Sequence, residues 1–147
     1  QELLAQVRRL AGTARYVTSV CTGALVLGAA GLLKGKRATT HWAWRDALPA
    51  FGATPESARV VRDGNVFTGG GVTAGIDFAL TVLAEVAGVA FAQSVQLRIE
   101  YAPDPPFHAG RPELAPAQVL ATAQERYEEV RSARDAAVQR AAARLSS

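Results

Sequence analysis

Hydrophobic and polar residues follow helical and strand-like periods in turn along the first third of this 147-residue chain. Apolar residues recur every three to four positions in residues 2–12, a spacing that predicts an amphipathic helix. The β-prone residues 16–20 predict a buried strand, and the long apolar run 24–33 predicts a helix that is buried on several sides. Gly28 and Gly31 lie within that run and indicate close backbone packing.

The middle of the chain predicts strands joined by short helical and turn segments. Residues 37–42 predict a second strand, parallel to the first through the helical crossover. Residues 44–50 are compatible with a short helix. Residues 59–68 predict a β-hairpin, because two β-prone runs flank the turn signal Asp63-Gly64.

The last part of the chain predicts helices separated by one loop. Three glycines at 69–71 lead into an apolar helix that starts at residue 73 and stops near residue 88. A second helix is expected over residues 90–101, followed by a proline-rich loop over residues 102–116. The charged, Ala-rich residues 117–147 predict a helix of roughly 45 Å, at ~1.5 Å per residue.

This order of elements predicts an α/β fold in which residues 1–147 form one domain. Two parallel strands and a hairpin are fewer strands than a doubly wound sheet normally holds, and they leave an open sheet edge beside residues 16–20. The chain contains no methionine. We therefore expect it to be incomplete at its N-terminus, with upstream strands completing the sheet.

The composition is that of an ordinary globular domain, with 49% hydrophobic and 20% charged residues. The net charge of +3 is spread without a basic stripe, which argues against a nucleic-acid partner. The longest apolar runs, at about ten residues, are too short to cross a bilayer. A single cysteine excludes an internal disulfide, and the start carries no leader pattern. We expect a cytoplasmic protein with no membrane partner.

The single cysteine, Cys21, follows the first predicted strand at a very tight turn. The turn directs its side chain out of the sheet end, where the N–H groups of the next helix favour a thiolate. This geometry suits a nucleophile, although a lone cysteine is also often a small hydrophobic core residue. One cysteine and two distant histidines, His41 and His108, cannot form a closed zinc site. We expect neither a metal nor another cofactor.

Several motifs resemble one known superfamily. Residues 19–24 and 38–42, which read Ser-Val-Cys-Thr-Gly-Ala and Ala-Thr-Thr-His-Trp, resemble the nucleophile-elbow region of the ThiJ/PfpI superfamily, relatives of the class I glutamine amidotransferases. Residues 68–77 and 96–107 narrow the resemblance to the isocyanide hydratases. It implies a flavodoxin-like three-layer sandwich with a mostly parallel sheet, assembled as a homodimer. It also implies that the first strands and a catalytic acid come before this chain.

The resemblance implies the hydration of an organic isocyanide to an N-substituted formamide. Cys21 would attack the isocyanide carbon and form a thioimidate, which water then hydrolyses. Thr22 would hydrogen-bond the upstream acid. A purely structural role for Thr22, as a cap that secures the turn, stays open.

Five further residues are expected to line the substrate pocket or to support it. They are Gly70, Val72, Thr73, His41 and Trp42. The glycines could equally serve only the strand-to-helix turn, and His41 could be structural because a carboxylic acid can replace a histidine base. Trp42 could belong to the aromatic core.

Other function classes remain open at this stage. The same elbow would serve a glyoxalase-like deglycase or a cysteine-based redox sensor. Ligand-binding domains of AraC-type regulators often carry the Thr-Thr-His-Trp motif. A non-enzymatic dimer subunit is a third alternative. In a homodimer we expect the apolar helix over residues 73–86 to be largely buried, because burying each large apolar side chain is worth ~1.5–3 kcal/mol.

Overall fold

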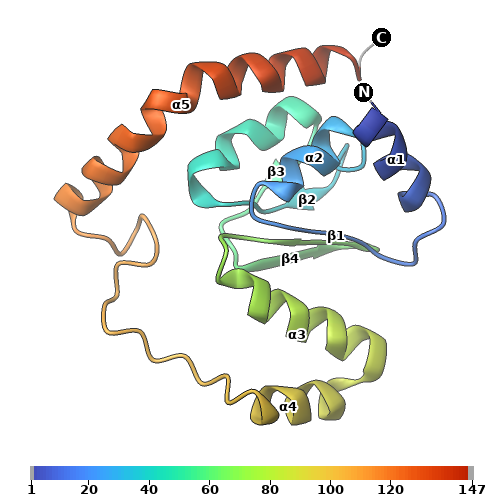
Figure 1. Cartoon of the computed structure of the whole chain (residues 1–147), viewed down its shortest axis with the longest axis vertical. Helices are drawn as coiled ribbons and strands as arrows, with labels where there is room; N and C mark the ends of the chain where they lie inside the picture. The colour runs from blue at the N-terminus through green and yellow to red at the C-terminus, as the bar shows by residue number, and fades with distance from the viewer. Residues whose placement is uncertain (1, 146–147) are drawn as a thin grey trace.

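The computed structural model describes residues 2–145 (Figure 1). In chain order its elements are α1 (Glu2–Ala11), β1 (Val17–Val20), α2 (Gly23–Ala29), β2 (Arg37–Ala38), the 3₁₀ helix η1 (Trp42–Phe51), β3 (Thr54–Pro55), β4 (Val60–Asp63), β5 (Val66–Gly69), α3 (Ala74–Ala87), α4 (Val89–Arg98) and α5 (Ala117–Ala143).

The central sheet has three strands in the order β1-β5-β4. Strand β1 pairs with β5 in parallel, from Val17 opposite Val66 to Val20 opposite Gly69, and β4 pairs with β5 antiparallel. In Figure 1 the sheet is seen nearly edge-on, with α2 on one side and α3 on the other. The fold is therefore a small mixed sheet between two helical layers.

The core lies on the α2 side of the sheet. Its members come from α2, η1, the strands and the short segments that follow α2 and η1: Ala24, Leu27, Leu33, Ala38, Leu48, Ala53 and Val66. A Cβ atom on Gly28 would lie 2.5 Å from Cδ2 of Phe51, so the predicted close packing at this glycine is confirmed. Gly31 ends the helical turn with a φ of +81°, a conformation that favours glycine.

The prediction of a strand over residues 37–42 is wrong in extent and in partner. Only Arg37–Ala38 is a strand, and it pairs with β3 rather than with β1. Two side chains explain this difference. The N–H of Thr39 donates to the Thr68 hydroxyl at 2.9 Å, and the N–H of Ala43 donates to Nδ1 of His41 at 3.3 Å. Because side chains satisfy this backbone, no ladder forms and η1 begins at Trp42.

The other predicted elements form. The helix predicted over residues 24–33 is shorter and ends at Ala29, and β1, predicted to be buried, is only partly buried, with Thr18 exposed. The hairpin forms, and Asp63 pairs with Val66, so Gly64 and Asn65 make the turn, one residue later than predicted. Gly64 has a φ of +63°, as such a turn requires. The helix predicted over residues 117–147 ends at Ala143 in the structure. Residues 146 and 147 of the predicted range lie outside the described part of the chain.

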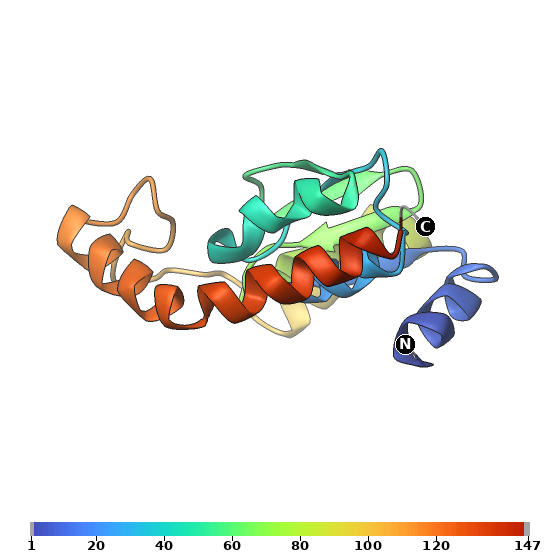
Figure 2. The same cartoon turned by 90° about the horizontal axis from the view of Figure 1, so that it is seen from above.

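An exposed loop, residues 99–116, leads from α4 to the long helix α5. Figures 1 and 2 show the C-terminal half of α5 lying beside η1 and α2, on the side of the molecule away from α4. Arg134 fixes it there through both oxygens of Asp46 and the carbonyl of Ala43, and its guanidinium lies over the ring of Trp44. Val138 completes the contact with Phe51.

None of the helices in residues 2–145 has the length and apolar character needed to cross a membrane.

Candidate active site

The turn after β1 holds Cys21 in a conformation that is uncommon for a residue with a side chain. Its φ is +55°, in the left-handed region. The N–H of Cys21 is shared between the carbonyls of Gly69 and Gly70, at 3.0 and 2.8 Å. Carbonyls at the end of β5 and directly after it therefore hold the cysteine backbone by hydrogen bonds. Cys21 is half-buried and is not enclosed in the core.

Buried threonines support the same turn from the other side. The hydroxyl of Thr40 donates to the carbonyl of Cys21 at 2.7 Å, and the N–H of Ala24 donates to that carbonyl at 3.3 Å. Thr39, Thr40 and Thr68 are all buried. Positive φ at a non-glycine residue is a typical sign of a functional constraint when its surroundings fix it in this way.

Thr22 occupies the N-cap position of α2, but its side chain makes no cap hydrogen bond. The residue is exposed. A purely structural cap would use its hydroxyl to bind an N–H of the first helical turn. The hydroxyl of Thr22 is therefore available to another partner.

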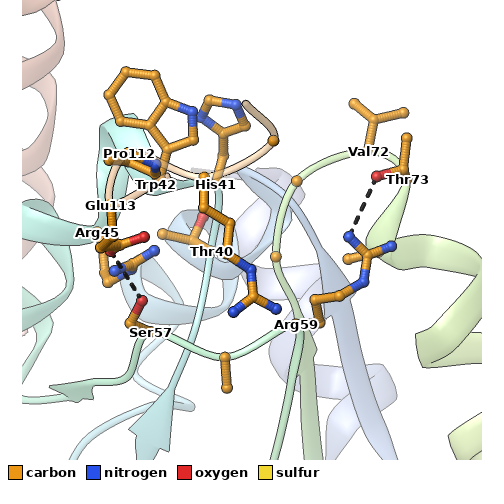
Figure 3. A pocket seen from close by; sticks show the side chains of 16 residues that line it. Thr40, His41, Trp42, Arg45, Ser57, Arg59, Val72, Thr73, Pro112 and Glu113 are labelled. Atoms are coloured by element: carbon orange, nitrogen blue, oxygen red, sulfur yellow. Dashed lines mark hydrogen bonds between the residues drawn. The ribbon is translucent and has the colours of Figure 1, made fainter. Parts of the chain in front are cut away.

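A cavity of about 270 Å³ opens beside this turn, with Arg45 and Ser57 on one side of it and Arg59 and Thr73 on the other (Figure 3). It brings together all five residues expected at the pocket. The lining residues are Thr40, His41, Trp42, Arg45, Ser57, Ala58, Arg59, Gly70, Gly71, Val72, Thr73, Ala74, Gly110, Arg111, Pro112 and Glu113.

Cys21 and Thr22 are not among the lining residues. The link between the cysteine and the cavity is the backbone, because Gly70 lines the cavity and its carbonyl accepts the N–H of Cys21. The first turn of α3 follows directly at Ala74. Its N-terminal dipole end therefore lies at the cavity wall, where it favours negative charge.

His41 is a half-buried residue of the cavity wall. Its Nδ1 accepts the N–H of Ala43, so the proton of the neutral ring is on Nε2. Burial lowers the pKa of His41, and the nearby positive charge of Arg45 lowers it further. The neutral ring is thus favoured. A Cβ atom on Gly71 would lie 3.2 Å from Cδ2 of this ring, which shows how closely the two residues approach.

Trp42 lines the cavity and also belongs to an aromatic cluster. The ring of Tyr127 on α5 lies edge-on to Trp42, with 5.3 Å between the ring centroids, and 5.7 Å from the ring of His41. Trp42 therefore has both the pocket position and the packing contacts that the sequence suggested as alternatives. His108, in the proline-rich loop, is exposed.

Sequence reasoning did not single out the charged groups of the cavity. Arg59 forms an ion pair with Asp77 and donates to the hydroxyl of Thr73 at 3.5 Å. Arg45, Arg111 and Glu113 complete the charged lining. No local motif marks these residues, because η1, the segment before β4 and the loop before α5 come together only in the folded chain.

No group of three or more histidine, cysteine, aspartate or glutamate side chains in residues 2–145 is arranged to hold a metal ion.

The chain is similar to several known proteins. The sequence model of the DJ-1/PfpI family matches residues 1–85. The isonitrile hydratase of Pseudomonas putida is 59% identical over 146 residues, which are 99% of this chain and 64% of that protein. The HTH-type transcriptional regulator GlxA of Rhizobium meliloti is 38% identical over 93 residues, which are 60% of this chain and 28% of that protein.

A solved structure agrees with these matches. A ThiJ/PfpI family protein from Pseudomonas syringae superposes with a TM-score of 0.89 at 50% identity, covering 96% of this chain and 57% of that chain. The chain therefore spans less than two thirds of the length of this protein and of the Pseudomonas putida hydratase.

Proposed function

Because this chain belongs to the DJ-1/PfpI family, we propose that it is the cysteine-bearing part of an isocyanide hydratase, a lyase that converts an organic isocyanide to an N-substituted formamide. One observation carries the proposal: the identity with the isonitrile hydratase runs through 99% of this chain at 59%. The hydrogen-bonded turn at Cys21, with its φ of +55°, supports a nucleophilic role for this residue.

The reaction proceeds in two steps. The thiolate of Cys21 attacks the terminal carbon of the isocyanide while a general acid protonates that carbon, which gives a thioimidate. Water then adds to the thioimidate carbon and one of its protons goes to the nitrogen. The hydroxyl proton returns to the acid as the carbonyl forms and the C–S bond breaks, which releases the formamide and the thiolate. Covalent catalysis divides one difficult addition into two easier steps, and acid–base assistance adds ~10²–10⁴-fold.

The acid comes from the part of such enzymes that precedes this chain, and the hydroxyl of Thr22 positions it. The lack of a cap hydrogen bond at Thr22 supports this role. The N-terminal end of α3, with Gly70, Val72 and Thr73, lies beside the substrate. His41 and Trp42 form the facing wall, and the neutral ring of His41 acts as a support rather than as the base.

The remaining parts of the proposal concern the assembly. Residues 1–147 belong to one domain, and upstream strands extend β1 into a mostly parallel, flavodoxin-like sandwich. Two such proteins form a homodimer that covers the apolar face of α3, where Ile76 and Val86 are 42% and 55% exposed in the single chain. The enzyme works in the cytoplasm without a cofactor and without a nucleic-acid or membrane partner.

The test is turnover of cyclohexyl isocyanide by the purified protein, with the formamide followed by chromatography. Cys21→Ser should lower kcat/KM by on the order of 10⁴- to 10⁶-fold, because the loss of a nucleophile in a covalent enzyme costs up to about 10⁶-fold. Thr54→Ser, at an exposed position of β3, is the control for handling and expression. Mass spectrometry of the acid-quenched enzyme should detect the thioimidate.

Two results would contradict the hydratase. Equal turnover by the wild type and Cys21→Ser would remove the covalent mechanism. Turnover of methylglyoxal without turnover of any isocyanide would instead favour the glyoxalase-like alternative on the same elbow.

A further inference from the structure

The charged groups that line the cavity are unbalanced. Three arginines, Arg45, Arg59 and Arg111, face one carboxylate, Glu113. Of the three, only Arg59 has a carboxylate partner within residues 2–145, because Asp77 holds it from outside the cavity. Two guanidinium groups therefore lie at the cavity without an ion pair among the described residues.

Of these two arginines, Arg45 gives the stronger indication of a bound ligand. The residue is half-buried, and its Nε is buried without a hydrogen-bond partner in the described part of the chain. Buried donors are almost always paired in folded proteins. No guanidinium nitrogen of Arg45 has a hydrogen-bond partner among residues 2–145, and its two terminal nitrogens, rather than the enclosed Nε, are the donors that a ligand in the cavity can reach. Burial, and after it the charge of Arg45, lowers the pKa of His41, so the arginines are the dominant positive charges of this wall.

The groups around the two arginines favour an anion as well. The N-terminus of α3 lies at the cavity and carries the positive end of a 14-residue helix. Glu113 is the one opposing charge of the lining; it accepts a hydrogen bond from the hydroxyl of Ser57 at 3.5 Å, so the net lining charge stays positive. Guanidinium groups recognise carboxylates in particular, since their planar N–H pairs match the two oxygens.

We propose that the cavity binds a carboxylate on the substrate through Arg45 and Arg111, so that the natural substrate is an isocyanide that bears a carboxylate group. The identity of the reacting group as an isocyanide rests on the proposed hydratase function. The anion site does not depend on that function. The Trp42 side of the cavity then contacts the carbon skeleton between the two groups.

Binding is tested first, with benzoate and benzamide as probes and titration calorimetry on the purified full-length protein. Benzoate should bind about tenfold more tightly than benzamide at low salt, and the preference should weaken as salt screens the charges. Arg111→Gln should remove most of the preference. Arg111 is exposed on a loop, so this variant is expected to fold, and Arg45→Gln provides a second test from another element. Arg98→Gln, an exposed arginine at the end of α4, is the matched control.

Turnover is tested next, with 4-isocyanobenzoate and 4-isocyanobenzamide. The ratio of kcat/KM for the benzoate to kcat/KM for the benzamide should be about ten in the wild type and should fall towards one in Arg111→Gln. The fall should come from a higher KM for 4-isocyanobenzoate rather than from a change in kcat. Preferential binding of benzoate without any isocyanide turnover would retain the anion site and reject the hydratase. Equal binding of benzoate and benzamide, or a preference that survives both arginine variants, would overturn the anion site whatever the turnover.

Discussion

The cavity has two walls that are built in different ways. We call Thr40, His41, Gly70 and Gly71 the inner wall and residues 110–113 the outer wall. The inner-wall residues are buried or half-buried, whereas three of the four outer-wall residues are exposed. The inner wall stands at the ends of paired strands. The outer wall belongs to a proline-rich loop that the chain reaches about forty residues later.

Because of this difference, the two walls are suited to different roles at the site. The inner wall holds the backbone of Cys21 through partly buried hydrogen bonds, and hydrogen bonds shielded from solvent resist local opening. The outer wall carries Arg111 and the Ser57–Glu113 hydrogen bond, which lies at the surface. We infer that the inner wall fixes the reacting atoms and that the outer wall determines which substrates enter. Loop walls on rigid scaffolds commonly have this role.

The largest expected effect is at the inner wall, in Thr40→Val. Valine keeps the shape of threonine but cannot donate to the carbonyl of Cys21. The free energy of unfolding should fall by about 1–2 kcal/mol, because a buried hydrogen bond is lost while Ala24 still donates to that carbonyl. Urea unfolding measures this change, and kcat should fall as the turn loosens.

Thr54→Val is the control for Thr40→Val, since Thr54 is exposed on β3. It should change the unfolding free energy by less than about 0.5 kcal/mol. Equal stability of the two variants would show that the Thr40 hydroxyl does not hold the cysteine turn.

The two walls also contain a matched pair of glycines. A Cβ atom on Gly71 would meet the ring of His41 at 3.2 Å, whereas a Cβ atom on Gly110 would meet nothing within 4 Å. Alanine restricts the unfolded chain similarly at both positions. Gly71→Ala should therefore be less stable than Gly110→Ala by about 0.5–1.5 kcal/mol, the cost of displacing a ring from its rotamer.

Thermal unfolding of the two glycine variants, side by side, measures this difference. A crystal structure of Gly71→Ala should show the His41 ring moved away from residue 71. If both variants are equally stable and the ring has not moved, the inner wall is less tightly packed than the contact at Gly71 indicates.

Elements and residues that depend on local sequence signals could be predicted, and most of them belong to the inner wall or to its supporting elements. The elbow at Cys21, the hairpin and the helices depend on local periods and turn signals, and all of them form. Three of the motifs that carry the family resemblance, in residues 19–24, 38–42 and 68–77, lie in or next to the inner wall and within the family match over residues 1–85, whereas the fourth, in residues 96–107, lies outside both. Five pocket residues on or beside that wall could therefore be named in advance, although their roles remain proposals.

The errors and omissions have physical causes that no local pattern contains. Residues 37–42 have strand-like composition, but the Thr39 N–H donates to the Thr68 hydroxyl and the Ala43 N–H donates to the His41 ring, so the ladder stops after Ala38. Arg45 and the outer wall reach the cavity from elements far apart in the chain. Their charges acquire meaning only when the fold places them around one cavity.

A smaller effect is expected from pH, through His41. Burial and Arg45 lower its pKa in the folded chain, so the unfolded chain takes up a proton first as the pH falls. The free energy of unfolding should thus decrease as the pH drops below 6.5, the ordinary value for histidine, until the folded form is also protonated. His41→Gln should flatten this part of the stability profile. An unchanged profile would mean that His41 titrates alike in both states.

The smallest effect is expected at the outer wall, in Ser57→Ala. The hydroxyl of Ser57 donates to Glu113 at 3.5 Å between two exposed residues, and such contacts contribute little to stability. The free energy of unfolding should change by less than about 0.5 kcal/mol. Because this bond holds Glu113 at the cavity, its loss should instead alter KM for a charged isocyanide more than KM for a neutral one. Urea unfolding and the two KM values, measured on the same preparation, separate these effects. A loss of stability as large as that of Thr40→Val would mean that the outer wall is as firmly built as the inner one, and the division of roles between them would fail.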